Sequence, residues 1–523
     1  MSASTASPLS FTITHTAPKA TRFAPRLGKL TFHRQNDQRI QLQTPGMLAT
    51  TSRGVVPHLS RDYYAQCEQS LRWTSVVFES FLEQNPPVPT LQNGEHALHT
   101  FLGFNPNTTV LSITARDPHD AREMPTNGNA HICAHTLRGV RKLSPEDWRS
   151  YAHSTKPDVL IALSDTPFTD PPYSQKRLTK SIERSAAWLL NILRPFSSSL
   201  PSPSATPDPK SFALFVPLAG TSSIGARRAF SESLREPLYG PEADALKGTG
   251  YTCLDDGVDG YTVDLVPLRA SLPAPSNGDV RQDEMIKELV QTSLKPLPPA
   301  KPLLITGTST PHEILRLVSD GGDIFDSKWA QRCADLGVTL DFEFPVRNES
   351  TNGKKQLGHN IYSTDYTHDF SPLSSSLAPA SSPSDAVPTC FCPTCSPVKP
   401  TSRLYHGIDR PQDSLVEDSG RGEYEKPYTR AYVHHLLHTH EMGAHALLAM
   451  HNLAVLEAFF EGVRSVLASS PSMFEDEVAR FAETYDEEFG VLKEAGDMWL
   501  GVEKARGKGR LAREKEAAGG DDE

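Results

Sequence analysis

The sequence lacks the features that would place it in a membrane or outside the cell. No apolar run approaches the roughly 20 residues that span a bilayer, and the start lacks the order of a secretory signal. Cysteine is scarce, and the seven residues make an odd number that does not suit a disulfide framework. We therefore expect a cytoplasmic protein with no transmembrane segment. Lys19, Arg22 and Arg26 precede the first acidic residue, Asp37, so peripheral association with the mitochondrial outer surface stays open.

An excess of positive charge is also missing. The 523 residues contain 52 Lys and Arg against 63 Asp and Glu, which gives a formal net charge of -11. A chain that holds a nucleic acid by itself usually carries a basic face. The composition therefore does not predict DNA binding, and any contact with RNA would need a local patch or a second protein.

Three of the few cysteines, Cys390, Cys392 and Cys395, fall within six residues. Thiolate and imidazole are the ligands of structural zinc sites, which use four of them. A helix predicted to begin near Tyr428 carries six histidines: His434, His435, His438, His440, His445 and His451. We predict one bound zinc ion, and spacing alone leaves the choice of histidine open. Alternatives are a redox pair at the C-x-x-C or thiols without metal.

The sequence around these histidines is distinctive. Residues 430–437 read Arg-Ala-Tyr-Val-His-His-Leu-Leu, and Glu441-Met442-Gly443-Ala444 and His451-Asn452-Leu453 follow. With the preceding C-x-C-x-x-C, this order resembles the zinc subdomain of tRNA-guanine transglycosylases. The resemblance implies that the zinc ligands are Cys390, Cys392, Cys395 and His451. The chain departs from the family between residues 396 and 429, where the family has only a few residues, and the role of this insertion is left open.

A second motif lies near the other end of the chain. Thr44-Pro45-Gly46 is a turn signal, and a predicted strand and a turn ending in Pro57-His58-Leu59 follow it. This order resembles the entry to the transglycosylase barrel, so two motifs occur in the family's order.

Short apolar segments alternate with helical patterns along the chain. The predicted strands are 110–114, 159–163, 212–216, 303–306 and 338–344, and the predicted helices include 175–193, 226–234, 282–294 and 311–319. This alternation predicts an α/β fold with a parallel sheet. Alone, it fits a doubly wound open sheet equally well. The resemblance implies a (β/α)8 barrel of the TIM type, with its active mouth at the carboxyl ends of the strands.

Composition suggests how the chain divides. We expect a disordered N-terminus over 1–25, an irregular barrel over 26–372 that starts with a hairpin and has a loop insertion at 197–209, and a Ser/Pro-rich mobile linker over 373–389. A zinc-binding subdomain over 390–470 would complete the barrel. Residues 471–523 are predicted to form a helical, charged tail.

The resemblance also implies a chemistry. In the family, one aspartate attacks the ribose carbon of a tRNA guanosine and a second handles protons. Asp323-Ile324-Phe325-Asp326-Ser327 places Asp326 at the nucleophile's position, but the Pro-Thr-Arg that follows in the family is absent. Asp117 is the candidate for the second aspartate, although the glycines of its loop are missing.

The other pocket motifs have also changed. The family's Asp-Glu-Cys-Thr-Pro, Gln-Gly-Gly and Gly-Leu-Ala-Val-Gly-Glu correspond here to residues 163–167, 218–220 and 263–268. An intact metal motif beside altered pocket loops is similar to the non-catalytic accessory subunits of the family. We therefore expect no catalytic residue, with Asp326 as the one candidate, and a heterodimer with a catalytic queuine tRNA-ribosyltransferase subunit.

Such a complex would exchange guanine for queuine at the wobble position of tRNAs with GUN anticodons, and this chain would meet tRNA only through the complex. The alternatives are an active transglycosylase that uses Asp326, or a zinc-stabilised binding module.

Overall fold

The computed structural model describes residues 7–16, 23–34, 38–169, 171–195, 211–272, 280–347, 353–399, 402–405, 414–417 and 423–507. The chain forms two compact units. The barrel unit comprises residues 1–57, 68–329 and 463–478, and the cysteine unit comprises 58–67, 330–462 and 479–523. The predicted insertion at 197–209 lies outside the described residues.

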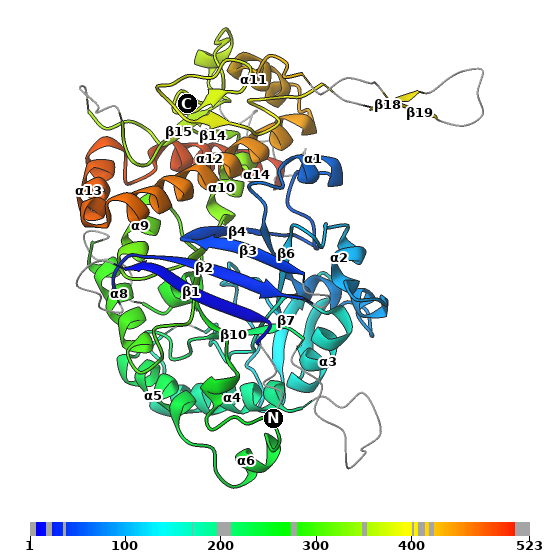
Figure 1. Cartoon of the computed structure of the whole chain (residues 1–523), viewed down its shortest axis with the longest axis vertical. Coiled ribbons are helices and arrows are strands. Elements are labelled where there is room, and N and C mark those ends of the chain that lie inside the picture. Colours follow the sequence, from blue (N-terminus) through cyan, green and yellow to red (C-terminus); the bar gives the residue numbers. More distant parts are fainter. Residues whose placement is uncertain are drawn as a thin grey trace, which may run out of the picture. The chain divides into compact units, whose positions relative to one another are not determined.

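A closed barrel of eight parallel strands forms the centre of the barrel unit (Figure 1). Its strands are β4 (Gly46–Thr50), β5 (Trp73–Val77), β6 (Val110–Thr114), β9 (Val159–Ile161), β10 (Ala213–Pro217), β11 (Gly260–Asp264), β12 (Leu303–Thr306) and β13 (Ile324–Asp326). They follow one another around the barrel in chain order, and β13 pairs with β4 to close it. The predicted (β/α)8 fold is therefore confirmed, and the open sheet is excluded.

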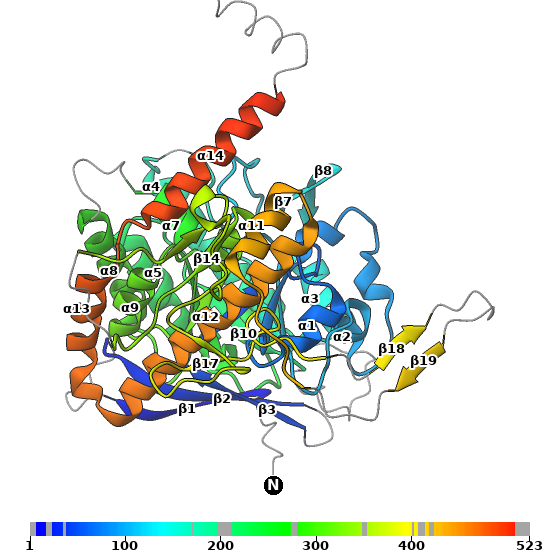
Figure 2. The same cartoon turned by 90° about the horizontal axis from the view of Figure 1, so that it is seen from above.

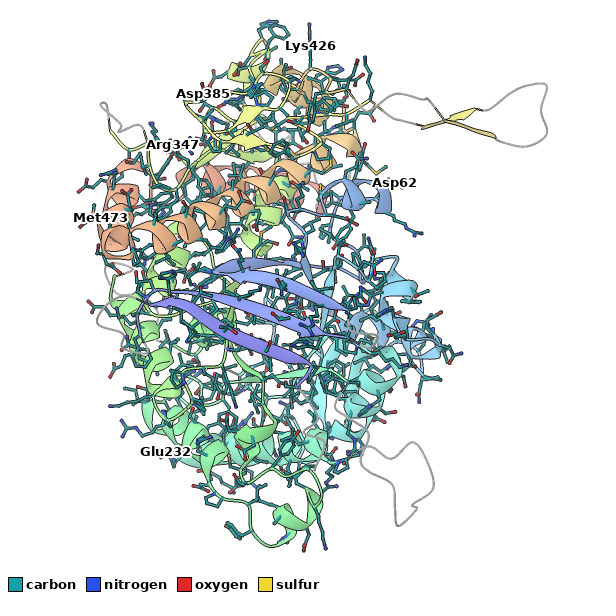
Figure 3. All side chains as sticks on the ribbon, viewed as in Figure 1. Asp62, Glu232, Arg347, Asp385, Lys426 and Met473 are labelled. Carbon is teal, nitrogen blue, oxygen red and sulfur yellow. The ribbon has the colours of Figure 1, made fainter. Side chains whose placement is uncertain are left out.

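Helices connect successive strands of the barrel. They are α2 (Ala97–Leu102), α3 (Pro145–Thr155), α4 (Gln175–Leu193), α5 (Ile224–Arg235), α6 (Pro241–Ala245), α7 (Leu265–Ala270), α8 (Val280–Leu294) and α9 (Pro311–Ser319), and α10 (Lys328–Asp335) follows the last strand, β13. The hydroxyl of Ser174 caps α4, and this helix buries Leu178, Trp188 and Leu189 on one face, as an amphipathic period requires. The helices also carry polar side chains on their exposed faces. One example is Glu232 of α5, which projects outward (Figure 3).

An antiparallel sheet packs against the barrel strands. It contains β1 (Leu9–Thr16), β2 (Arg26–His33) and β3 (Arg39–Thr44), of which the last two form the predicted hairpin. Leu30 and Phe32 belong to the same buried cluster as barrel residues such as Trp73. The predicted disorder over 1–25 is therefore wrong for β1, because its backbone pairs with β2 and it contributes Leu9 to this cluster.

One predicted strand lies outside the barrel. Residues 338–344 form only β14 (Val338–Leu340), which pairs antiparallel with β15 (Gly358–Asn360). The prediction that this segment continues the parallel series is wrong, because β4 already occupies the free edge of β13. A further hairpin, β7 (Ile132–Thr136) and β8 (Gly139–Leu143), is inserted after β6.

The cysteine unit contains mainly short strands and helices. Its remaining strands are β16 (Ala378–Pro379), β17 (Thr389–Cys390), β18 (Ser402–Tyr405) and β19 (Ser414–Glu417), and its helices include α1 (Arg61–Gln66), α11 (Arg430–His438) and α14 (Gly490–Gly507). Figure 2 shows these elements from a second side. The predicted helix over 474–506 is divided into α13 (Phe474–Thr484) and α14.

The Ser/Pro-rich segment 373–389 is not the mobile linker that its composition suggests. Leu373 is completely buried. The carboxylate of Asp341 accepts hydrogen bonds from the hydroxyl groups of Ser374 and Ser375 and from the backbone amides of Ser375 and Ser376. A buried charge with this many donors is stabilised, so the serines fix the segment.

The predicted histidine-bearing helix is two helices. α11 ends at His438, and α12 (Met442–Ser469) begins after His440, whose φ is 59°. Among the described residues, α12 is long and apolar enough to cross a membrane by length and composition, but 72% of its apolar window is buried. This burial is typical of a core helix, so α12 is weak support for a membrane span.

Candidate metal centre and barrel mouth

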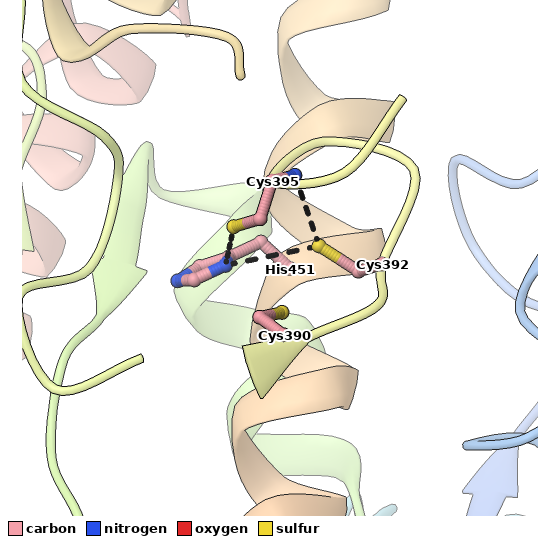
Figure 4. A group of neighbouring side chains, drawn as sticks. All are labelled: Cys390, Cys392, Cys395 and His451. Carbon is pink, nitrogen blue, oxygen red and sulfur yellow. Dashed lines mark hydrogen bonds between the residues drawn. The ribbon is translucent and has the colours of Figure 1, made fainter. Parts of the chain in front are cut away.

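The structure brings Cys390, Cys392, Cys395 and His451 together in the cysteine unit (Figure 4). One ligand atom from each lies within 4.8 Å of the others, and all four side chains are buried. Nδ1 of His451 is 3.2 Å from Sγ of Cys395 and 4.0 Å from Sγ of Cys392. Three sulfurs and one nitrogen in such a space form a group that can hold one metal ion, and the donor set suits zinc.

The surroundings of His451 prepare Nδ1 for a metal. Nε2 of the ring lies 3.0 Å from the carbonyl oxygen of Leu340, so Nε2 carries the proton and Nδ1 presents its lone pair to the cysteines. The next residue, Asn452, donates to the carbonyl oxygen of Val338 and accepts from the amide of Leu340. The side chains of His451 and Asn452 thus connect α12 to β14 by hydrogen bonds.

The thiols themselves also fit a metal. Burial opposes ionisation of Cys392, but hydrogen bonds from Cys390 and Cys395 outweigh it and hold the pKa of Cys392 well below its usual value. The backbone amide of Cys395 also donates to Sγ of Cys392 at 3.3 Å. A thiolate at the centre of the group is the form that binds metals.

Three other histidines of α11 and α12 have different partners. Nδ1 of His434 bonds to the carbonyl oxygen of Ile361, and Nδ1 of His445 bonds to that of Ala334. His438 reaches the carbonyl oxygen of Tyr362. These rings hold backbone segments together, so among the six only His451 faces the cysteines.

Asp326 ends barrel strand β13 and is fully buried at the barrel mouth. Its carboxylate accepts from the backbone amide of Lys328 at 2.9 Å and from the amide of Gly307. It also faces Nε2 of His119 at 3.1 Å. These contacts hold the carboxylate in one orientation.

Asp117, the candidate second aspartate, lies on the other side of the same histidine. Its Oδ1 is 3.0 Å from Nδ1 of His119. Burial alone would lower the pKa of His119, but the carboxylates of Asp326 and Asp117 outweigh it and raise this pKa to about 9. His119 is therefore an imidazolium at neutral pH that donates to both carboxylates.

A third carboxylate of the mouth, Asp165, is also neutralised by this chain. Arg177 binds it through two nitrogens, at 2.8 and 2.9 Å, and Arg184 adds a contact at 3.1 Å. Nδ2 of Asn127 donates to it at 2.7 Å. A carboxylate held by two guanidinium groups has few lone pairs left for an external ligand.

The space that remains is small. A cavity of about 60 Å³ adjoins Asp117, Thr166 and Asp264. A second, of about 240 Å³, lies against Asp117, Glu79 and Lys328. Sites for small molecules usually measure about 300–1,000 Å³. Both cavities are therefore smaller than a typical binding pocket, and Asp326, Asp117 and Asp165 beside them are each paired with a cation.

Sequence reasoning did not identify the residues that neutralise the mouth. His119 was visible two positions after Asp117, but nothing in the sequence indicated that it would reach Asp326, more than 200 positions later. Arg177 and Arg184 were assigned only to a helix, α4. Their spacing of seven residues places both on one helix face, which is the signal that could have found them.

A (β/α)8 barrel with a Cys3His group defines the class of protein, and comparison with known proteins agrees with it. The family model "Queuine tRNA-ribosyltransferase" matches residues 22–487. The chain therefore belongs to the queuine tRNA-ribosyltransferase family.

Curated relatives are similar over most of their length. A protein of Schizosaccharomyces pombe named "Queuine tRNA-ribosyltransferase accessory subunit 2" is 25% identical over 445 residues, which cover 85% of this chain and 79% of that protein. Proteins with the same name from Drosophila persimilis and Drosophila erecta are 24% and 26% identical, cover 86% and 85% of this chain, and are themselves covered to 87% and 86%.

Proposed function

We propose that this chain is a non-catalytic accessory subunit of a heterodimeric queuine tRNA-ribosyltransferase. The observation that carries the proposal is that three carboxylates of the mouth, Asp326, Asp117 and Asp165, are bound by the chain's own cations. Asp326 and Asp117 share His119, and Asp165 is held by two arginines. A nucleophilic carboxylate must be free to approach the substrate. The names of the relatives support the same role.

The complex would exchange guanine for queuine at the wobble position of tRNAs with GUN anticodons. The catalytic partner would supply the nucleophile, and this chain would contribute to the assembly and to the placement of tRNA. The target base must leave its stack to be reached, so a second subunit that holds the surrounding tRNA would assist the exchange without touching the base.

We also propose that the metal is one zinc ion with a structural role. Four protein ligands leave no open position for substrate, as in closed structural sites. The Cys3His group binds the cysteine loop to α12, and Thr394 of this loop donates to the carbonyl oxygen of Leu447 in the same helix. Zinc would therefore stabilise the cysteine unit.

An exposed aromatic face beside the cysteines is the proposed contact with the catalytic subunit. Its proposed members are exposed rings of the cysteine unit, namely Phe370, Phe391, Tyr424, Tyr428 and Tyr432. The amide of Tyr428 donates to the carbonyl oxygen of Thr394, and the rings of Tyr428 and Tyr432 stack with centroids 5.5 Å apart. Aromatic side chains are enriched at protein interfaces, and Lys426, exposed between Tyr424 and Tyr428 in the sequence, adds a polar group.

A reconstitution experiment tests the role. Base exchange with labelled guanine or queuine is measured for this chain alone, for the catalytic subunit alone and for the mixture. We expect exchange only in the mixture, unchanged by Asp326→Ala in this chain. Exchange by this chain alone that is lost in Asp326→Ala would instead establish an active transglycosylase.

The interface is tested separately. Phe391→Ser should weaken the heterodimer at least tenfold in sedimentation velocity, because hot-spot aromatics contribute about 2 kcal/mol or more. Tyr239→Ser, which removes an even more exposed ring from the barrel unit, is the control and should leave the affinity unchanged. Equal weakening by both variants would remove the aromatic face from the proposal.

A further inference from the structure

His119 has the contacts of a bound ligand, although it belongs to the chain. Its ring is largely buried, and its two nitrogens face carboxylate oxygens on opposite edges, Asp117 at 3.0 Å and Asp326 at 3.1 Å. The two carboxylates are far apart in the sequence, since Asp117 follows β6 and Asp326 ends β13. A flat ring with an N–H on each edge is therefore held as a small molecule would be.

Acidic groups dominate the surroundings of this ring. Besides its two partners, the carboxyl group of Asp264 on β11 interacts electrostatically with the ring. Glu79, which follows β5, interacts electrostatically with Asp117 and with Asp120. Lys328 contributes a positive charge on the side of Asp117. Without His119, the buried carboxylate of Asp326 and the partly exposed carboxylate of Asp117 would have no cation between them.

We propose that the barrel mouth contains a site for a small N-heteroaromatic cation of the imidazolium class, and that the side chain of His119 occupies it as a built-in ligand. The proposal rests on these contacts and does not depend on the accessory role. It makes His119 the residue that closes the mouth to external ring compounds, since any such compound would have to displace a side chain tethered at the site.

The remaining walls are already formed. The carboxylate of Asp326 is fixed by the amides of Gly307 and Lys328 whether or not the ring is present, and the cavity of about 60 Å³ adjoins Asp117. Replacing His119 by glycine would join the space of the ring to this cavity. A preformed site binds a matching ligand with a small ordering cost, so free imidazole should fill it.

The experiment uses the full chain with His119→Gly and imidazole as the probe. We expect saturable binding of one imidazole in isothermal titration, with a dissociation constant on the order of 1 mM, and a rise in melting temperature with imidazole concentration. The unsubstituted protein should show neither effect. Adding Asp117→Asn to His119→Gly should weaken binding about tenfold, because one charged hydrogen bond is lost.

Absence of saturable binding in a folded His119→Gly protein, or equal binding by the unsubstituted protein, would overturn the proposal. If His119→Gly does not fold, ¹⁵N NMR of the intact chain decides. The signals of His119 are assigned by their disappearance in His119→Gln. They should show that both ring nitrogens are protonated at pH 7.5. A ring with one protonated nitrogen at that pH would be a neutral core histidine, and the proposed cation site would be wrong.

Discussion

Replacing Cys392 by serine should remove the metal and loosen the cysteine unit. Its sulfur accepts a hydrogen bond from the backbone amide of Cys395 and lies near Nδ1 of His451. Cys392 is therefore at the centre of the ligand group. A hydroxyl is a poor substitute for a thiolate. In the unsubstituted protein, hydrogen bonds within the group and then burial hold the pKa values of Cys390 and Cys395 well above normal.

The expected loss follows from linkage between metal binding and folding. Zinc-finger sites bind zinc with apparent free energies of about 10–16 kcal/mol near neutral pH. At a free zinc concentration about 1,000 times the dissociation constant, binding stabilises the folded state by about 4 kcal/mol. The cysteine unit of Cys392→Ser should therefore lose about 4 kcal/mol in free energy of unfolding, with the effect concentrated where His451 and Asn452 join α12 to β14.

Zinc content and chemical unfolding are measured on the same preparations. The unsubstituted protein should contain one zinc per chain and Cys392→Ser should contain none, while a chelator should bring the first protein to the stability of the second. Cys253→Ser, a buried thiol of the barrel unit, is the control and should keep its zinc. One zinc per chain in Cys392→Ser would refute the ligand assignment.

Three further predictions concern the frame of the molecule. Arg26→Met should lower the free energy of unfolding in urea by about 3–5 kcal/mol, because it removes the cation that lies 2.5 Å from the buried carboxylate of Asp323. A loss below 1 kcal/mol would contradict this. Burial and neighbouring aspartates raise the pKa of Glu79 to about 7, so its contribution to stability is present below about pH 4.3 and is lost as pH rises to 7. Glu79→Gln should remove that decline in melting temperature, and parallel profiles for both proteins would argue against it. Gly462→Ala should destabilise by about 1–3 kcal/mol, because its Cβ would overlap the carbonyl oxygen of Phe344, whereas Gly443→Ala in the same helix meets nothing within 4 Å and should be neutral or stabilising in thermal melts.

Local patterns predicted much of the barrel. The strands at 110–114 and 303–306 and the helices at 175–193 and 311–319 have the predicted bounds, because each is a compact apolar run or an amphipathic period with a clear cap. The short strand β13, with three residues, was not predicted as a strand. So short a segment carries no periodicity, and its pairing with β4 depends on the closure of the whole barrel.

The candidate sites differ in the same way. The cysteine spacing indicated a metal group, and the resemblance named His451, which the structure places beside the cysteines. By contrast, the contacts of His119 and of the two arginines depend on loops that meet only in the folded barrel. The serine-rich segment 373–389 was misjudged for a related reason. Its composition is that of a linker, but the buried charge of Asp341 organises it.

The most direct test of the accessory role is to find which chain becomes attached to tRNA. The reconstituted heterodimer is incubated with substrate tRNA, the covalent intermediate is trapped by denaturation, and each subunit is analysed by mass spectrometry for a linked nucleotide. We predict that every linked nucleotide lies on the catalytic partner and that peptides containing Asp326 are unmodified. A nucleotide attached to Asp326 of this chain would contradict the accessory role.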